Sequence, residues 1–370
     1  MNLVMLGDFS GRNVGHNVLL RALVHQLGRL DPERIVVPTL RPGPVSRVVR
    51  DLERVRLLGT APWHGALKFR SVSLRRAVAR ADLLLLVDNQ LHEKGFGNPL
   101  ANSMGALIGL AALAARRGVP RVYLHGSVGP LSRPRALRLA ARLAGSLDHV
   151  LLRDHAALRD FRALAPHLPA RVTADAAFDP APGVRPRAGE TPSEGDVIAV
   201  NVGGQTLIGA GPERSAGAWA ATLRDLSETV GLPLVLIVTH PRDLHVAQEL
   251  RRHLPDGRVE IHAPPPERFT ETSDALLART ACAVGDRYHE LVMFAAAGVP
   301  IVGLSGGDKV ESLFEMIERP DLVVASSGVV AKEDLSASVA AAIEGRARLA
   351  ARVAELRAAV VEGVESVSPR

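Results

Sequence analysis

Short apolar runs alternate with amphipathic stretches along this sequence, and the alternation occurs twice. The apolar runs have the length of strands, and the stretches between them carry apolar residues at helical spacing. The strand-like runs begin at residues 2, 34, 82, 121 and 149 in the first half and at 196, 233, 258, 281 and 300 in the second. Strands that alternate with helices form parallel sheets covered by helices on both faces. The sequence therefore predicts an α/β fold of two doubly wound, Rossmann-like domains facing a cleft.

A stretch rich in proline, glycine and charged residues separates the two halves. It covers 181–196 and has the composition of an interdomain linker. We therefore predict an N-terminal domain over 1–180 and a C-terminal domain over 197–370. Residues 331–363 are Ala-rich and helical in pattern, and we expect this helix to pack on the second domain or to cross back to the first.

The composition excludes several classes of protein. The chain has 370 residues, 47% of them hydrophobic and 23% charged, which is enough for two apolar cores and argues against disorder. Cys282 is the single cysteine, so one chain forms neither a disulfide nor a cysteine-based metal site, as is usual in a reducing cytoplasm. No uninterrupted apolar segment reaches the roughly 18 to 20 residues of a membrane span. We therefore expect a cytoplasmic globular protein.

The net charge of +6 comes from arginine, which is concentrated in 41–56 and 133–142. Such charge attracts phosphorylated metabolites, lipid-linked phosphates or a membrane face to which a protein binds peripherally. A general bias of the composition toward Arg and Ala explains the charge equally well, and the sequence leaves both interpretations open. Nucleic-acid binding is not expected, because the basic runs lack interleaved aromatic residues and no recognised nucleic-acid-binding motif is present.

The stretch "GDRYHELVMFAAAGVP" (285–300) carries two cationic side chains where an apolar strand turns into an apolar helix. Asp286 is the predicted N-cap, so Arg287, Tyr288 and His289 fall in the first turn, and Gly298 is suited to end the helix. The free backbone N–H groups of a first turn and a guanidinium beside them form an anion site. The alternative is that Arg287 pairs with a local carboxylate and His289 is an ordinary buried histidine.

Other strand ends give weaker signals. The glycine pairs in "NVGGQ" (201–205) and "LSGG" (304–307) let a backbone approach a phosphate, but tight turns explain them as well. Asp243 in "THPRD" is suited to cap the following helix. The groups His92 with Glu93 and His240 with Asp243 and His245 fit no metal-ligand spacing, and no serine nucleophile motif is present. We expect no metal and no cofactor.

Several of these segments, taken in order, resemble the polysaccharide pyruvyl transferase family. They are "LHGSVGP", "LLRDHAALRDF", "VTADAAFD", "THPRDLHVAQEL" and, above all, "GDRYHELVMFAAAGVPIVGLSGGDKVESL". The resemblance implies a fold similar to GT-B glycosyltransferases and transfer of the enolpyruvyl group of phosphoenolpyruvate to two hydroxyls of a sugar, glycan or lipid-linked saccharide. The products are a pyruvate ketal and phosphate. By the same resemblance Arg153, Arg287 and His289 hold the donor, which places it on the C-terminal side and the acceptor on the N-terminal side.

The chemistry of phosphoenolpyruvate agrees with these residues. Its phosphate and carboxylate lie close together and match two arginines, and Lys309 adds positive charge. Attack at its C2 carbon requires a proton on the methylene carbon, which an imidazolium at position 289 can deliver. We therefore predict that His289 is the general acid.

The sequence departs from the family pattern at two places, both in the N-terminal half. His16 stands where the family has an acidic residue, and Asp88, Asn89 and Gln90 replace a common glycine pair. His16, Asp88 and Asn89 are therefore candidates for the acceptor side. Asp88 or His16 is either the base that takes the acceptor proton or a plain hydrogen-bonding group.

Two further functions fit the same architecture. One is a glycosyltransferase that uses a nucleotide sugar, although an aromatic content of 3% offers few platforms for base stacking. The other is a non-catalytic member of the fold, which the altered N-terminal loops would suit.

Overall fold

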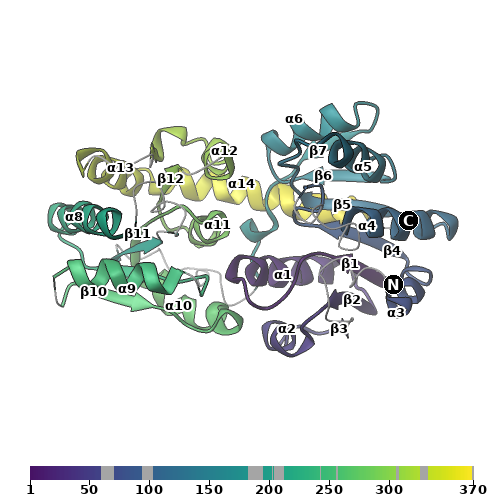
Figure 1. Ribbon diagram of the computed structural model, residues 1–370, viewed down its shortest axis with the longest axis horizontal. Helices are drawn as coiled ribbons and strands as arrows, with labels where there is room; N and C mark the ends of the chain where they lie inside the picture. The colour runs from purple at the N-terminus through teal and green to yellow at the C-terminus, as the bar shows by residue number, and fades with distance from the viewer. Residues whose placement is uncertain are drawn as a thin grey trace. The chain divides into compact units, whose positions relative to one another are not determined.

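The computed structural model describes residues 1–59, 71–93, 103–181, 195–201, 203, 212–241, 243–255, 257–305, 308–325 and 332–368. The chain divides into two compact units (Figure 1). Unit 1 contains Met1–Gly11, Leu19–Asp179 and Leu356–Arg370, and unit 2 contains Arg12–Val18 and Pro180–Glu355. The predicted linker lies mostly outside the described residues.

Unit 1 is built on a seven-stranded sheet with the order β3-β2-β1-β4-β5-β6-β7, and all its strand pairs are parallel. The strands are β1 (Asn2–Leu6), β2 (Arg34–Thr39), β3 (Val55–Gly59), β4 (Leu83–Val87), β5 (Arg121–Gly126), β6 (His149–Leu152) and β7 (Ala170–Val172). The helices are α1 (Val14–Leu27), η1 (Gly28–Leu30), α2 (Pro42–Val48), α3 (Val72–Val78), α4 (Ser103–Arg116), α5 (Pro134–Ala144), α6 (His155–Leu164) and η4 (Ala176–Phe178).

The strands of this sheet are apolar throughout because both faces are covered. Successive side chains of a strand point to opposite faces. Accordingly Leu3 and Met5 belong to one buried cluster, whereas Val4 and Leu6 belong to another on the opposite face. A strand buried on both sides has no reason to alternate apolar and polar residues, which explains its continuous apolar sequence.

Unit 2 repeats the same topology with six parallel strands in the order β10-β9-β8-β11-β12-β13. The strands are β8 (Val197–Asn201), β9 (Leu234–Ile237), β10 (Val259–His262), β11 (Thr280–Gly285), β12 (Ile301–Ser305) and β13 (Val323–Ala325). The helices are α8 (Pro212–Val230), α9 (Asp243–His253), η6 (Pro266–Arg268), α10 (Phe269–Arg279), α11 (Tyr288–Ala296), α12 (Asp308–Met316), η7 (Pro320–Leu322), α13 (Lys332–Glu344) and α14 (Arg346–Glu365). Cys282 is fully buried in β11, as expected for a packing residue.

The prediction that the second domain runs to residue 370 is wrong at its end, because the last part of α14 belongs to unit 1. Val360 and Val364 on this helix and Val367 just after it are at most 5% exposed, and the last two belong to the core of unit 1. A Cβ added at Gly363 would lie 2.9 Å from the methyl carbon of Thr173, so this glycine allows the helix to approach the end of β7 closely.

The predicted alternation of strands and helices is confirmed in both units, and the Ala-rich C-terminal segment is helical. The strand starts expected from the sequence omit β3, β7 and β13, and the sequence analysis also missed α2 and α3. The stretch 41–56 reads as a run of arginines, yet Pro42 starts α2 at a position where proline is favoured, and β3 follows as the edge strand of the sheet.

Each unit has one point where the strand order reverses. It lies between β1 and β4 in unit 1 and between β8 and β11 in unit 2. Loops that leave the carboxyl ends of two such strands diverge to opposite faces of the sheet, so this is where doubly wound proteins bind ligands. The segments after β4 and β11 include Asp88 and Arg287.

Candidate functional site

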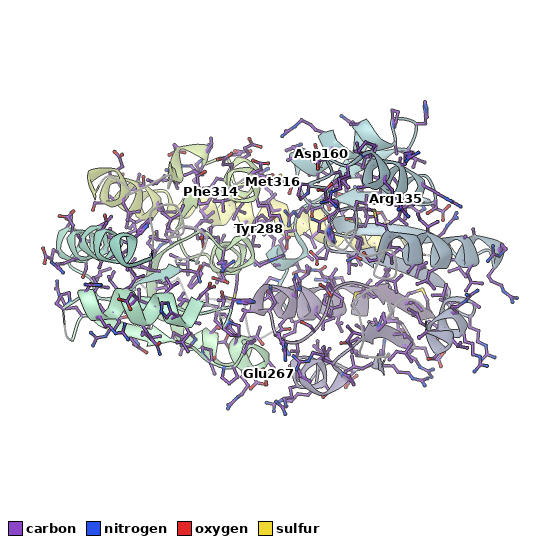
Figure 2. The ribbon with its side chains drawn as sticks, viewed as in Figure 1. Arg135, Asp160, Glu267, Tyr288, Phe314 and Met316 are labelled. Carbon is purple, nitrogen blue, oxygen red and sulfur yellow. The ribbon has the colours of Figure 1, made fainter. Side chains whose placement is uncertain are left out.

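The N-terminus of α11 lies at the reversal point of unit 2 and carries Arg287, Tyr288 and His289. Arg287 itself is the N-cap, with an extended backbone, so the helix begins one residue later than predicted. The predicted N-cap, Asp286, instead accepts a hydrogen bond of 3.1 Å from the backbone N–H of Gly203. Tyr288, labelled in Figure 2, is the first residue of the helix and is 8% exposed. The helix ends at Ala296, and Gly298 follows with φ +77°, as predicted for its C-terminal glycine.

The guanidinium of Arg287 is bound to Asp243, the first residue of α9. Nη2 donates to both carboxyl oxygens at 2.7 Å, and Asp243 is buried. Burial by itself would lower the pKa of Arg287, but the charge of Asp243 and its hydrogen bond outweigh burial and raise it. The Nε atom of Arg287 is buried and has no hydrogen-bond partner among the described residues; Asp286 Oδ1 lies 4.0 Å from it. Arg287 therefore pairs with a carboxylate, as the alternative held, but the partner lies 44 positions away in the sequence and engages Nη2 alone.

Gly203 allows these groups to lie close together. A Cβ at this position would lie 2.9 Å from both carboxyl oxygens of Asp286 and 3.0 Å from Cζ of Arg287. Any other residue would therefore push Arg287 or Asp286 away. The reason for a glycine here is close packing of side chains in the same unit.

Glu290, in the first turn of α11, is a buried carboxyl group that the sequence analysis did not single out. It is 6% exposed, and its side chain is hydrogen-bonded to Thr239 after β9. Burial raises the pKa of Glu290 well above its ordinary value, and the nearby charges of Asp286 and Asp243 act in the same direction, whereas Thr239 and Arg287 oppose it. Glu290 therefore takes up a proton at a higher pH than an exposed glutamate does.

His289 is partly buried beside two other rings. Its ring centroid lies 6.4 Å from that of His16, in an edge-on arrangement, and 5.2 Å from that of Tyr288. A Cβ at Gly15 would lie 2.8 Å from Nδ1 of His289. Residues 12–18 are grouped with unit 2, so His16 is beside the predicted general acid. Lys309, the second residue of α12, is exposed at the start of the next helix along the chain.

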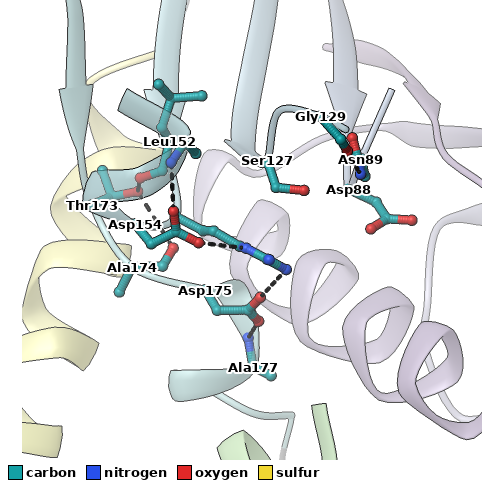
Figure 3. A network of polar contacts seen from close by, with 12 residues as sticks. Asp88, Asn89, Ser127, Gly129, Leu152, Asp154, Thr173, Ala174, Asp175 and Ala177 are labelled. Atoms are coloured by element: carbon teal, nitrogen blue, oxygen red, sulfur yellow. Dashed lines mark hydrogen bonds and ion pairs between the residues drawn. The ribbon is translucent and has the colours of Figure 1, made fainter. Parts of the chain in front are cut away.

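Polar side chains also gather where three adjacent strands of unit 1 end. Asp88 and Asn89 follow β4 and Ser127 follows β5 (Figure 3), and Arg153 follows β6. The fully buried hydroxyl of Tyr123 lies 2.8 Å from the carbonyl oxygen of Asp88 and 2.5 Å from that of Ser127, so it joins the first two loops. Asp88 has φ +62°, a strained value for a residue with a side chain, and such strain is concentrated at functional sites.

Arg153 is buried among carboxylates. Its Nε donates to Asp154 at 2.9 Å, and its Nη1 lies 3.8 Å from Asp175. Burial raises the pKa of Asp175 to about 6; the charge of Arg153 lowers it, and the charges of Asp88 and Asp154 raise it. Two carboxyl groups thus share one guanidinium, and Asp175 takes up a proton as the pH falls through about 6.

The comparison with known families gives a match over most of the chain. The family profile described as polysaccharide pyruvyl transferase matches residues 13–308. The chain belongs to the polysaccharide pyruvyl transferase family. The match covers the ends of β4, β6 and β11 and reaches the first residue of α12, so every predicted donor residue but Lys309 lies within it.

Solved structures show the fold that this pyruvyl transferase family member shares. A putative UDP-N-acetylglucosamine 2-epimerase from Listeria monocytogenes is 14% identical with a TM-score of 0.62, covering 95% of this chain and 90% of its own. HepE from Anabaena, in complex with UDP and glucose, is 15% identical with a TM-score of 0.61, and the match covers 100% of this chain and 97% of HepE. The UDP-GlcNAc 2-epimerase from Neisseria meningitidis, bound to UDP-GlcNAc, is 10% identical with a TM-score of 0.59, covering 100% of both. At these identities the likeness establishes the fold, which is of the GT-B type with two Rossmann-like domains. No protein among those with curated descriptions matches the sequence.

The structure brings together some of the predicted residues of this pyruvyl transferase family member. Arg287, His289 and His16 lie in unit 2, and Asp88, Asn89 and Arg153 lie in unit 1. Sequence reasoning missed Asp243 as the partner of Arg287 and Asp175 as the partner of Arg153. It also missed Glu290 and its partner Thr239. Asp243 was noted only as a helix-capping residue, because two residues more than 20 positions apart leave no local pattern that shows their pairing.

Within the part of the chain that the structure describes, no three His, Cys, Asp or Glu side chains are grouped as metal ligands. None of the described helices combines the length and apolar character that a membrane span requires.

Proposed function

We propose that the protein transfers the enolpyruvyl group of phosphoenolpyruvate to a vicinal or 1,3-diol of a saccharide and forms a pyruvate ketal. The observation that supports this most is the place of Arg287 and His289, at the N-terminus of the helix that follows the reversal point of unit 2. There the backbone N–H groups of the first turn and the exposed part of the Arg287 guanidinium provide positive charge for a phosphate and a carboxylate, and we expect Lys309 to add to it.

The reaction needs few groups from the protein. One acceptor hydroxyl attacks C2 of the donor while His289 protonates the methylene carbon, which becomes a methyl group. The C–O bond to phosphate breaks, and the second hydroxyl attacks the same carbon to close the ketal. Of the two hydroxyl protons, one balances the proton placed on the methyl group and the other leaves with the phosphate. No oxidant and no metal is required by this balance.

The unit 1 residues are proposed to bind the acceptor. Asp88, Asn89 and Ser127 offer neutral and anionic hydrogen-bonding groups at one sheet edge, which suits sugar hydroxyls. For Arg153 the family resemblance points to the donor. We therefore expect Arg153→Ala to raise the KM for phosphoenolpyruvate, whereas an effect confined to the acceptor KM would assign it to the sugar.

The deciding experiment offers the full chain phosphoenolpyruvate and a panel of mono- and oligosaccharides, free and lipid-linked. Product formation is a mass increase equal to pyruvic acid minus water, with one phosphate released for each ketal. If UDP-sugars are consumed with release of UDP while phosphoenolpyruvate is not, the protein is a glycosyltransferase. If neither donor is consumed but phosphoenolpyruvate binds, it is a non-catalytic member of the family.

A further inference from the structure

Three buried polar atoms that need hydrogen-bond partners belong to residues that line a small cavity inside unit 2. They are Oδ1 of Asn201, Nε of Arg287 and Oε2 of Glu290, all buried and without a hydrogen-bond partner among the described residues. Asn201 and Glu290 are 4% and 6% exposed. The rest of the lining is apolar and includes Ile237, Leu291 and Phe294. Polar atoms left unsatisfied in such surroundings cost about 1–3 kcal/mol each, so they need a partner.

The other atoms of these residues are already engaged. The amide nitrogen of Asn201 donates to the carbonyl oxygen of Ile237 at 3.0 Å and lies 3.5 Å from the hydroxyl of Thr239. The hydroxyl of Thr239 is in turn hydrogen-bonded to Glu290. Asn201 cannot be flipped without losing these contacts, so its unsatisfied amide atom is Oδ1, an acceptor.

The three atoms and the cavity fit one water molecule. The cavity volume is ≈ 10 Å³, about the space that a single buried water needs. A protonated Glu290 offers an O–H donor and Arg287 offers an N–H donor, while Asn201 offers an acceptor. One water accepts from the first two and donates to the third, which satisfies every group.

We propose that Glu290 is a positioning residue for Arg287: its carboxyl group, together with Asn201 and one water bound in this cavity, holds the Nε atom of the guanidinium. Asp243 holds Nη2, so the guanidinium is fixed at two of its three nitrogens. This inference rests on the proposed function for its catalytic consequence, because a fixed Arg287 presents its charge to the anionic donor.

The protonation state of Glu290 matters for this arrangement. The charged groups that face it are Arg287, Asp286 and Asp243. When Glu290 ionises, it becomes a third carboxylate around Arg287, so the guanidinium turns toward it and less positive charge remains for the donor. Since the carboxyl group is protonated below its raised pKa, the KM for phosphoenolpyruvate should be low there and rise as the pH increases through that pKa.

The test compares Glu290→Gln, Glu290→Ala and the exposed Glu315→Gln as matched control. We expect the glutamine variant, which keeps the shape and stays neutral, to match the wild-type KM for phosphoenolpyruvate within twofold at low pH and to lose the rise at high pH. The alanine variant should raise KM about tenfold at every pH with little change in kcat. Glu315→Gln should retain the wild-type profile.

A second measurement does not depend on turnover. The Nε–H signal of Arg287 in ¹⁵N NMR spectra should exchange slowly with water in the wild type and in Glu290→Gln, and fast in Glu290→Ala. If phosphoenolpyruvate is not a substrate but these exchange rates hold, the proposed function fails and the positioning role stands. Unchanged Nε–H exchange in Glu290→Ala would overturn the inference. A KM for phosphoenolpyruvate that still rises with pH in Glu290→Gln, as in the wild type, would also overturn it. If the alanine variant does not fold, this pH profile of Glu290→Gln is the deciding measurement.

Discussion

At the scale of the residue, the surroundings of His289 bear on its proposed role as the general acid. It is partly buried at the start of α11, beside His16 and two residues after Arg287, the helix N-cap. If the donor binds at this helix N-terminus as proposed, the imidazole lies next to it, which is the position that a general acid needs.

Replacing His289 by alanine should lower kcat by roughly 10²–10⁴, the usual contribution of general acid catalysis. The affinity for phosphoenolpyruvate should change less, because Arg287 remains. Phosphate release in the presence of a competent acceptor measures the first quantity and calorimetry the second. His245→Ala, an exposed histidine on α9, is the control. Full turnover by His289→Ala would exclude this residue as the acid.

His125 gives a prediction for stability in acid. It is fully buried at the end of β5 with φ +49°, and its Nδ1 lies 2.8 Å from the hydroxyl of Thr173. Burial lowers the pKa of His125 to about 3, and the charge of Arg171 acts in the same direction. Because the folded state disfavours the protonated form, the contribution of His125 to stability is present above pH 6.5 and is lost as the pH falls toward 3.

Asparagine at position 125 keeps a polar atom near Nδ1, tolerates a left-handed backbone and does not titrate in this range. Relative to His125→Asn, the wild type should lose about 2 kcal/mol of unfolding free energy between pH 7 and pH 5. Urea unfolding at a series of pH values measures this difference. Asp175 titrates in both proteins, so its contribution largely cancels when the two are compared. Parallel pH curves for the two proteins would contradict a buried neutral histidine.

At the scale of the element, helix starts show what a cap contributes and what a buried ion pair adds. Ser71 caps α3 by accepting from the N–H of Leu74 at 3.1 Å, and Asp154 caps α6 by accepting from Ala157 at 2.7 Å. Only the second cap also holds a buried arginine, Arg153. The two caps therefore have the same local geometry and different surroundings.

We expect Ser71→Ala to lower the free energy of unfolding by about 1 kcal/mol, the usual cost of a lost N-cap. Asp154→Ala should cost roughly 3–5 kcal/mol, because it also leaves the charge of Arg153 without its closest carboxylate. Denaturant unfolding of both variants measures the difference. Equal losses of unfolding free energy in the two variants would mean that Asp175 by itself is enough to compensate the charge of Arg153.

The elements that the sequence predicted and those that it missed differ in burial. β1, β4 and β11 have at least four buried residues each and stand out as apolar runs. β3 is an edge strand with the sequence "VRLLG" and no fully buried residue, so it lacks that signal. Edge strands and the short helices beside them are where hydrophobic periodicity fails as a guide.

At the scale of the whole molecule, α14 ends in the unit where the chain began. Val364 is fully buried in the unit 1 core, whereas its neighbour Glu365 is exposed. Val364→Ala should reduce stability by about 2 kcal/mol, at ~0.8 kcal/mol per buried methylene plus a cavity term. Hydrogen exchange should speed up in β1, β4 and β5 but not in β8 to β13. Glu365→Ala should change neither, and faster exchange in unit 2 would contradict the assignment of this segment to unit 1.

The sequence by itself determined the class of fold, the family and the position of the cationic turn at 287–289. These depend on local patterns: apolar runs of strand length, helical spacing between them, and an ordered set of motifs. A local pattern survives in the sequence because its members lie within a few residues of one another.

Only the tertiary structure decided what surrounds those residues. The order of the strands places Arg287 beside the reversal point of unit 2, and packing between α9 and α11 pairs it with Asp243, 44 positions away. Packing also buries Glu290 against Thr239 and groups the end of α14 with the first half of the chain. Such pairs are set by which surfaces meet when the chain is compact, and burial then determines which of their side chains carry a charge.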